Sequence, residues 1–268
     1  MKIGKGGGLK VKIIEKNEEK LKFILEDSDA AFANTLRRIM ITEIPNLAID
    51  IVEFYDNTSA LFDEVIAHRL GLIPLVFDPT KFNFTEECKC GGKGCPLCQV
   101  FFALEKTGPC TVYSSDLKSS DKNVKPTSPD FPIVKLLKDQ KIKLEAIARL
   151  GRGKEHAKFQ AANASYGYLP LLGVSPKAES LEKIVKACPK GVLEIKNKKL
   201  VLADPYKCDL CKVCEEVSEG EVKIKGDETK FVFNVETISG LEPAYIVEKA
   251  IEILEEKAKE FKEQLKGL

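Results

Sequence analysis

The most regular hydrophobic pattern in the chain lies between Asp27 and Leu75, where apolar residues recur at helical spacing in two runs. Apolar side chains three and four residues apart share one face of a helix, so each run predicts a short amphipathic helix. The first run consists of Phe32, Ala33, Leu36 and Met40, and the second of Phe62, Val65, Ile66 and Leu70. Ser28 or Asp27 is expected to cap the first helix, Pro45 prevents its continuation, and Gly71 should end the second.

Elsewhere apolar and polar residues alternate, which is the pattern of half-buried strands. Strands are predicted at residues 9–14, 21–25, 48–55, 99–104, 110–114, 133–150 and 230–236. The first two should form a hairpin around residues 16–19, while residues 115–132, rich in Ser, Asp and Pro, predict an irregular loop. Helices and strands in this order indicate an α+β fold.

A long final helix is predicted from Pro243, which suits a first turn. Its apolar stripe comprises Tyr245 or Ile246, Ala250, Leu254, Ala258, Phe261 and Leu265, opposite a face of Lys and Glu. The stripe either packs within this chain or forms a helix-to-helix contact with a partner chain. Because it continues to the end of the sequence, we favour the partner.

Composition narrows the class of protein. A length of 268 residues, 44% of them hydrophobic, suffices for two or three small domains. The formal net charge of +1 argues against a protein that grips a nucleic-acid backbone, so any nucleic-acid contact should be indirect. No apolar run is long enough to span a membrane, and a cytoplasmic location is expected. The nine cysteines occur mostly in two tight groups, which indicates metal ligation rather than disulfides.

The first cysteine group predicts a structural metal site. It comprises Cys88, Cys90, Cys95 and Cys98, with glycines between that permit tight turns. Four thiolates can enclose Zn²⁺ tetrahedrally without leaving an open position, so zinc is the preferred metal. An iron-sulfur cluster and unmetallated thiols remain alternatives, since spacing alone does not select the metal.

The second cysteine group has the spacing of a ferredoxin. Cys208, Cys211 and Cys214 supply three thiolates, and Cys188, followed by proline, supplies a remote fourth. This pattern predicts one 4Fe-4S cluster, with a 3Fe-4S cluster possible and zinc as the alternative. The ligand positions of a second cluster hold Ala178, Leu181, Ile184 and Ser218 instead. The first three of these fall on one helical face and should fill the vacant space as core.

One set of residues extends across much of the chain and resembles the signature of the alpha-like subunits of multisubunit RNA polymerases. The set comprises Phe32, Asn34, Leu36, Arg37, Arg38, Glu43, Pro45, Asn57, Ser59, Asp63, Glu64, His68, Arg69, Leu70, Ile73 and Pro74, together with residues 151–159 and the final helix. The resemblance is nearest to the archaeal D subunits, some of which carry a ferredoxin-like insertion. The third subunit of eukaryotic polymerase II and the amino-terminal domain of bacterial alpha are more distant relatives.

This resemblance implies three domains. Residues 1–47 with 227–268 would form a discontinuous dimerisation domain, residues 48–172 a mostly β insert domain carrying the first cysteine group, and residues 173–226 a small ferredoxin-like cluster domain. It also implies a non-catalytic assembly platform of DNA-directed RNA polymerase. The partners would be a small L-like subunit, N-like and P-like small subunits, and the large catalytic subunits. Candidate interface residues are Phe32, Leu36, Arg37, Arg38, Asp63, Glu64, His68, Arg69, Ile246, Leu254 and Phe261.

A different class of function is an iron-sulfur protein that transfers electrons or senses redox state. The sequence contains no flavin or nicotinamide fingerprint beside the cysteines, which disfavours electron transfer. It also contains no Asp-x-Asp-x-Asp run to hold the magnesium ions of nucleotidyl transfer, so no catalytic residue is expected in this chain.

Overall fold

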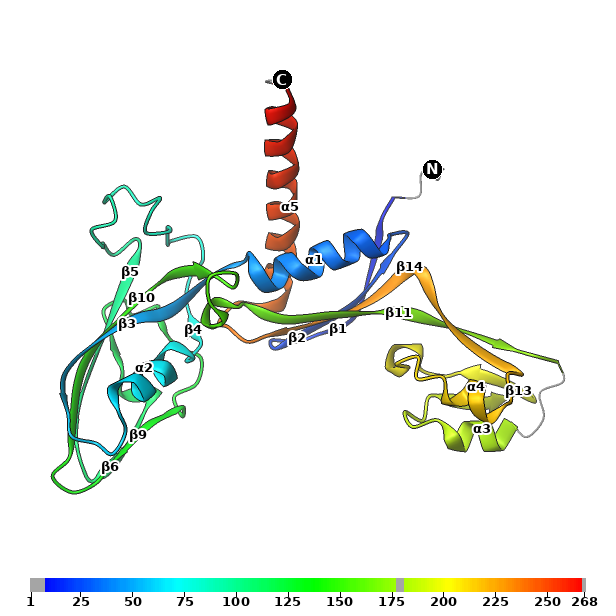
Figure 1. The fold of residues 1–268 in the computed structure, drawn as a ribbon, viewed down its shortest axis with the longest axis horizontal. Coiled ribbons are helices and arrows are strands. Elements are labelled where there is room, and N and C mark those ends of the chain that lie inside the picture. The colour runs from blue at the N-terminus through cyan, green and yellow to red at the C-terminus, as the bar shows by residue number, and fades with distance from the viewer. Residues whose placement is uncertain (1–7, 177–180, 267–268) are drawn as a thin grey trace. The chain divides into compact units, whose positions relative to one another are not determined.

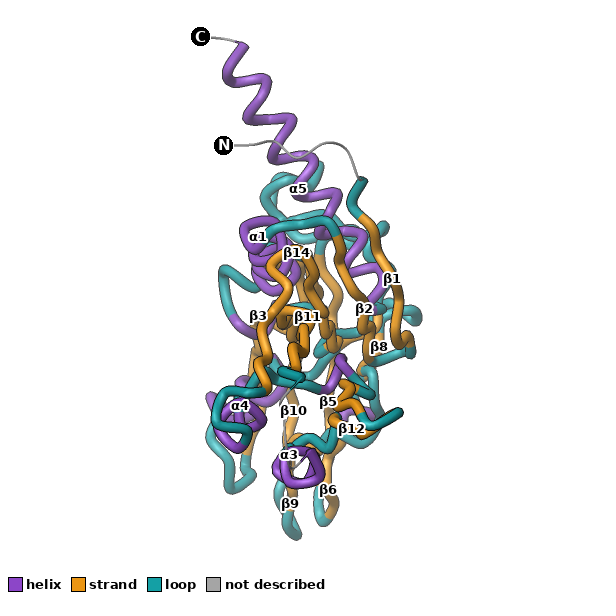
Figure 2. Tube along the Cα trace, turned by 90° about the vertical axis from the view of Figure 1, so that its right-hand side faces the viewer, coloured by secondary structure: helices purple, strands orange, loops and turns teal. Residues whose placement is uncertain are grey.

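The computed structural model describes residues 8–176 and 181–266, which form two compact units (Figure 1). One unit combines the described residues up to Arg37 with those of Ser165–Val235. The other combines Arg38–Ala164 with the described residues from Glu236 onward. Strands predominate and helices are few (Figure 2), so the mixture of helices and strands predicted from the sequence is confirmed.

The first unit is built on a four-stranded sheet of order β1-β2-β14-β11. Its strands are β1 (Lys10–Lys16), β2 (Lys20–Glu26), β11 (Ala162–Val174) and β14 (Val222–Thr237). The predicted hairpin is present, with Ile13 opposite Phe23. Phe23 in turn stacks on Phe233 of β14, with ring centroids 4.9 Å apart, so the two central strands share one aromatic core.

Helix α1 (Ala30–Thr42) buries Ala33, Leu36 and Met40 of its predicted stripe, whereas Phe32 is half-buried. The buried side chains are Ala33, Leu36, Ile39 and Met40. The predicted cap is wrong by one or two residues: the Asp29 carboxylate accepts a hydrogen bond from the Phe32 amide at 2.8 Å. Asp27 instead takes a left-handed conformation with φ of 58°. Asp29 stands directly before the first helical residue and supplies the capping carboxylate.

A small insertion lies between β11 and β14. It contains α3 (Leu181–Ala187), β12 (Leu193–Lys196), β13 (Lys199–Leu202), η3 (Pro205–Lys207) and α4 (Val213–Val217). Its buried core consists of Ile184, Leu193, Leu200, Cys214, Val222 and Ile224. As expected, Ile184 lies in this core and Leu181 packs against it, while Ser218 is buried. Ala178 lies outside the described residues.

The second unit holds another four-stranded sheet, of order β3-β10-β5-β7. Its strands are β3 (Pro45–Asn57), β5 (Gln99–Thr107), β7 (Lys118–Ser119) and β10 (Lys141–Arg152). Short pairs join β4 (Leu75–Val76) to β8 (Lys125–Pro126) and β6 (Cys110–Tyr113) to β9 (Pro132–Leu136), and the short helices are η1 (Ser114–Asp116) and η2 (Ala157–Phe159). Residues 115–132, predicted as irregular, therefore include β7 and β8.

Helix α2 (Asp63–Gly71) corrects one predicted apolar face. Ile66 and Leu70 are buried, but Phe62 is 78% exposed and Val65 is 39% exposed. Phe62 occupies the N-cap position in extended conformation, so its side chain precedes the helix and does not share its inner face.

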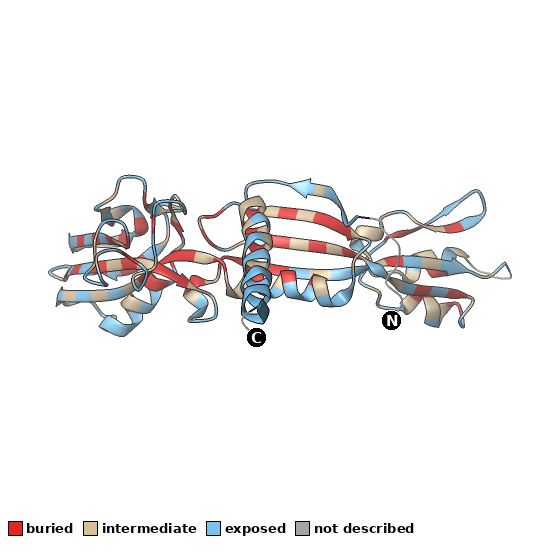
Figure 3. Ribbon diagram, turned by 90° about the horizontal axis from the view of Figure 1, so that it is seen from above, coloured by how far each residue is buried: buried red, intermediate tan, exposed pale blue. Residues whose placement is uncertain are grey.

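Helix α5 (Pro243–Lys266) buries only its first turns. Pro243, Ile246 and Ala250 are buried, whereas every residue from Glu255 to Lys266 is exposed (Figure 3). Phe261 and Leu265 are 64% and 53% exposed. The described part of the chain contains no helix long and apolar enough to cross a membrane.

Glycine at position 153 is required by a close backbone approach. A Cβ there would stand 2.2 Å from the Ile41 carbonyl oxygen of α1. We predict that Gly153→Ala destabilises the second unit by about 1–3 kcal/mol, because the loop must shift away from α1. Urea unfolding followed by circular dichroism measures this. Gly167→Ala is the control, since its Cβ meets nothing within 4 Å; equal effects of the two changes would contradict the account.

Candidate functional site

The first cysteine group forms a closed cluster of sulfur atoms. The four Sγ atoms of Cys88, Cys90, Cys95 and Cys98 all lie within 4.8 Å of one another. Three of the Sγ–Sγ distances are 3.6, 3.7 and 3.8 Å. The loop can bring them together because Gly91, Gly92 and Gly94 take positive φ angles of 64°, 78° and 80°. The structure thus assembles all four predicted ligands.

These separations fit a single metal ion. Zn–S bonds of about 2.3 Å in a tetrahedron place the sulfur atoms about 3.8 Å apart. An iron-sulfur cluster inserts its own atoms between the thiolates and holds them farther apart. The geometry of the first group therefore suits one tetrahedral ion better than a cluster.

Two thiols of this group differ in their readiness to ionise. Burial raises the pKa of Cys90, but hydrogen bonds with the thiols of Cys88, Cys98 and Cys95 outweigh it and lower the pKa to about 7. Burial raises the pKa of Cys98 to about 12. Because the thiolate is the metal-binding form, Cys90 is the thiol that offers it near neutral pH.

The second cysteine group surrounds a cavity. Cys188, Cys208, Cys211 and Cys214 line a space of about 20 Å³, which is closed on the inside by Leu193 and Ile224 among others. Among the described residues, these sulfur atoms do not form a group as close as that of Cys88–Cys98. The cavity brings the four cysteines to one place, but a space of about 20 Å³ is room for about one water molecule and does not select between a single ion and a cluster.

The backbone between these cysteines turns through two left-handed residues. Leu210 and Lys212 have φ angles of 58° and 65°, which curl the segment so that Cys208, Cys211 and Cys214 face the same cavity. Burial raises the pKa of both Cys208 and Cys214. Cys211 is the exposed member of the set.

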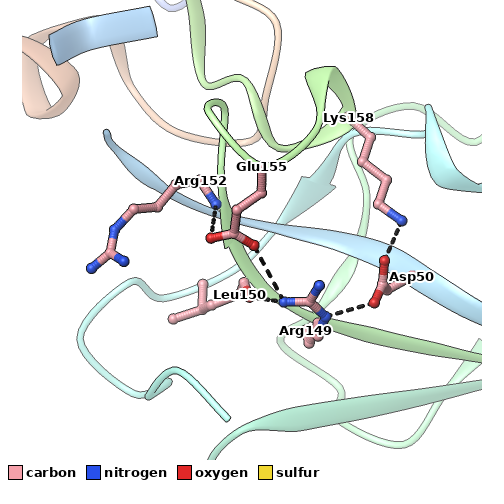
Figure 4. Close-up of polar contacts among 6 residues, drawn as sticks. All are labelled: Asp50, Arg149, Leu150, Arg152, Glu155 and Lys158. Carbon is pink, nitrogen blue, oxygen red and sulfur yellow. Dashed lines mark hydrogen bonds and ion pairs between the residues drawn. The ribbon is translucent and has the colours of Figure 1, made fainter. Parts of the chain in front are cut away.

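A network of charges fixes the segment that follows β10 (Figure 4). The Asp50 carboxylate on β3 accepts hydrogen bonds from Arg149 Nε at 2.6 Å and from Lys158 Nζ. The Arg149 guanidinium also lies 3.6 Å from the Glu155 carboxylate. Burial favours a higher pKa for Asp50, but the bonds from Lys158 and Arg149 outweigh it and hold the pKa below its ordinary value.

The same segment contacts the chain that leads into the first cysteine group. The guanidinium of Arg152 lies 4.1 Å from the centre of the Phe84 ring, a cation–π contact. Gly151 is pressed against Phe159, whose ring atoms would stand 2.6 Å from a Cβ at that position. Contacts therefore fix both ends of residues 151–159, and the exposed Glu155 and His156 lie between these fixed ends.

Glu43 connects its own segment, directly after α1, to two others through ion pairs. Its carboxylate lies 3.2 Å from Lys154 Nζ and 3.0 Å from Lys257 Nζ. Glu43 follows α1, Lys154 belongs to the loop after β10, and Lys257 lies on α5. Burial favours a higher pKa for Glu43, but the two lysines outweigh it and lower the pKa. This node ties α5 to its unit beyond the buried first turns.

The remaining interface candidates are dispersed. Leu36 and Ile246 are buried within the chain, Leu254 is half-buried and Phe261 is exposed. Phe32 is half-buried on α1, where Arg37 donates to Asn34 Oδ1 at 2.9 Å and Arg38 is exposed. On α2, Asp63 accepts from Asn57, Arg69 donates to the Ile133 carbonyl, and Glu64 and His68 are exposed.

No hydrophobic pattern or motif in the sequence points to Asp50, Arg149 or Lys257, and Lys158 stands out only as part of residues 151–159. The available signal was an acidic residue at position 50 directly after the apolar run Leu47–Ile49 in a predicted strand. Such a charge needs a partner when it is half-buried. Its partners are 99 and 108 residues away, so only the fold identifies them.

Comparison with known proteins defines the class. Residues 49–173 match the family described as the RNA polymerase Rpb3/RpoA insert domain. The fold and this match place the chain among the alpha-like subunits of RNA polymerase.

Relatives of full length define the family more closely. DNA-directed RNA polymerase subunit Rpo3 of Methanosphaera stadtmanae is 41% identical over 260 residues, covering 93% of this chain and 96% of that protein. Rpo3 of Pyrococcus horikoshii is 42% identical over 262 residues, covering 97% and 99%. Rpo3 of Methanosarcina acetivorans is 39% identical over 257 residues, covering 94% and 96%. The chain belongs to the Rpo3 family of archaeal DNA-directed RNA polymerase subunits.

This family membership confirms the interpretation as a polymerase subunit without an active site of its own. It supports that interpretation over an electron-transfer protein. The names and the family establish no cofactor for either cysteine group.

The charge network predicts a pH-dependent stability. Asp50→Asn should destabilise the second unit by about 1–3 kcal/mol at pH 7, because Arg149 and Lys158 lose a charged acceptor. The folded-state pKa of Asp50 is lowered, so its contribution is complete above the unfolded value of about 3.9 and is lost as pH falls through the folded value.

The difference between Asp50→Asn and wild type should therefore shrink below about pH 4 in urea titrations. Asp56→Asn is the matched control on the same strand, since its ion pair with Lys141 is more exposed and should contribute less. A difference that is unchanged between pH 7 and pH 3 would contradict this assignment.

Proposed function

We propose that the chain is an assembly platform of the polymerase, pairing with a small L-like subunit and docking N-like, P-like and large catalytic subunits. The observation that carries the proposal is the exposed apolar stripe of α5. Phe261 and Leu265 lie in water on a helix that is otherwise rich in Lys and Glu. Burying such side chains is worth about 1.5–3 kcal/mol each, so a partner helix that covers them gains stability.

Three domains follow from the proposal. Residues 1–47 with 227–268 would form the dimerisation domain, residues 48–172 the insert domain and residues 173–226 the cluster domain. The match of residues 49–173 to an insert domain supports the proposed insert domain of residues 48–172. The Glu43 node supports only part of the first, because it joins the segment after α1 to Lys257 of α5 within the second unit, whereas the described residues up to Arg37 belong to the first unit.

The two cysteine groups receive different cofactors in this proposal. Zn²⁺ would be held by Cys88, Cys90, Cys95 and Cys98, supported by sulfur separations suited to a tetrahedral ion. One 4Fe-4S cluster, or a 3Fe-4S form of it, would be held by Cys188, Cys208, Cys211 and Cys214, supported by their ferredoxin-like spacing and by the fact that all four line one cavity. Both groups would act structurally, by tying loops together.

The platform would carry out no nucleotidyl transfer and would contact nucleic acid only through other subunits. A cytoplasmic location follows from membership in a transcribing complex. Electron transfer is not favoured, since the relatives that cover nearly the whole chain are polymerase subunits.

Pairing through α5 can be tested on the full chain. Phe261→Ser with Leu265→Ser should weaken binding of the L-like subunit by at least about 100-fold, because two buried anchors are lost. Glu256→Ser with Glu263→Ser on the opposite face is the matched control. Truncation after Glu252 should abolish pairing. Isothermal titration calorimetry measures the affinities, and a doubly serine-substituted stripe that binds like wild type would refute the proposed contact.

The division of the cysteines into two sites can be tested by metal analysis. Cys98→Ser should release one equivalent of zinc and leave the brown iron-sulfur absorbance, whereas Cys211→Ser should lose the absorbance and retain zinc. Cys110→Ser, which changes the cysteine outside both groups, should retain both. Loss of colour in Cys98→Ser would mean that the ligands are divided wrongly.

A further inference from the structure

A second cavity in the first unit shares Cys208 with the cavity of the second cysteine group and is otherwise lined by residues to which no role has been assigned. It measures about 370 Å³ and lies between the sheet and the turn that precedes Cys208. Volumes of about 300–1,000 Å³ are typical of sites for small molecules. Its lining includes Lys20, Lys22, Ser165, Tyr168, Tyr206 and Asn234.

Three neighbouring strands supply one wall. Lys20 and Lys22 alternate on β2, while Ser165 and Asn234 lie on β11 and β14. These positions lie on the sheet face opposite the buried Phe23, Phe231 and Phe233. The opposite wall comes from η3, so the cavity joins the sheet to the insertion.

The charge of this lining is one-sided. It contains two lysines and no aspartate or glutamate. Lys22 is half-buried, and its ammonium donates to the Tyr206 carbonyl oxygen at 3.0 Å. Within the described ranges Lys22 forms no ion pair, although Glu15 of β1 is its cross-strand neighbour, and two of the three ammonium donors of Lys22 remain for another acceptor.

Such a setting favours an anion. A half-buried ammonium is costly without a counter-charge, and charge-assisted hydrogen bonds to phosphate oxygens offset that cost. The hydroxyl of Ser165 and the amide of Asn234 add polar groups to the lining, and the aromatic side chain of Tyr206 adds apolar surface. A phosphate ion alone would fill little of the volume.

We propose that this cavity binds a small phosphate ester of mononucleotide size, with the phosphate at Lys22 and a planar group against the side chain of Tyr206. Such a ligand would bridge β2 and the turn leading to Cys208, and would therefore connect the sheet to the insertion. The site depends on the fold of the first unit and not on pairing through α5.

Calorimetry on the full chain tests the site with four probes: AMP, ribose 5-phosphate, inorganic phosphate and adenosine. AMP should bind more tightly than ribose 5-phosphate if the side chain of Tyr206 contributes, and adenosine should show no binding up to about 10 mM. Lys22→Met keeps the aliphatic stem but removes the charge, and should weaken AMP binding by about 10-fold or more. Lys12→Met on β1, outside the cavity lining, should leave it unchanged.

Several outcomes would overturn the site. These are absence of AMP binding by wild type, equal affinity of Lys22→Met and Lys12→Met, or equal binding of adenosine and AMP. A shift of the iron-sulfur reduction potential in Lys22→Met without phosphate-ester binding would assign Lys22 to the cluster instead. Because the L-like subunit is absent from this titration, its result is independent of whether the assembly proposal holds.

Discussion

An apolar stripe that no other described residue of the chain covers is the constraint on which the rest of this molecule depends. Helix α5 is buried only over its first turns, and Phe261 and Leu265 stand in water with charged residues around them. A 24-residue helix with this exposure gains little from its own unit. We propose that another chain of the polymerase covers the stripe, since the chain belongs to the Rpo3 family of polymerase subunits.

Two carboxylates, Glu43 and Asp50, hold the loops and helices of the second unit in place through ion pairs. Glu43 binds Lys154 and Lys257, so α1, the loop after β10 and α5 meet at one carboxylate. Asp50 does the same for Arg149 and Lys158 within the second unit. Neither carboxylate belongs to a catalytic arrangement. Each one binds a lysine of the segment after β10 and so holds that segment to its unit.

Local periodicity was sufficient to predict α1, α5 and the β1–β2 hairpin, because their side-chain patterns depend on neighbours a few residues away. The closeness of Cys88, Cys90, Cys95 and Cys98 was predictable for the same reason, since glycines between them allow a tight loop. The cap at Asp29 and the exposure of Phe62 were missed. In both places the helix begins one or two residues from where hydrophobicity suggested, and backbone conformation decides that boundary.

Contacts between segments far apart in the chain could not be predicted from the sequence. Asp50 and Lys158 are 108 residues apart, and Lys22 and Tyr206 are 184 apart, so no sequence spacing pairs them. The cavity lined by Lys22 was invisible for that reason, as its walls come from three strands and a turn. Metal identity was also undecided by spacing, and only the sulfur separations of Cys88–Cys98 favour one tetrahedral ion.

The central claim is that this chain works as part of a polymerase rather than alone. The most direct measurement is purification of the amino-terminally tagged full chain from its native host, followed by mass spectrometry of the co-purifying chains and an assay of DNA-dependent RNA synthesis. The account predicts recovery in a large complex that contains the catalytic subunits and an L-like subunit and that synthesises RNA. Recovery as a free protein that exchanges electrons with a carrier would contradict it.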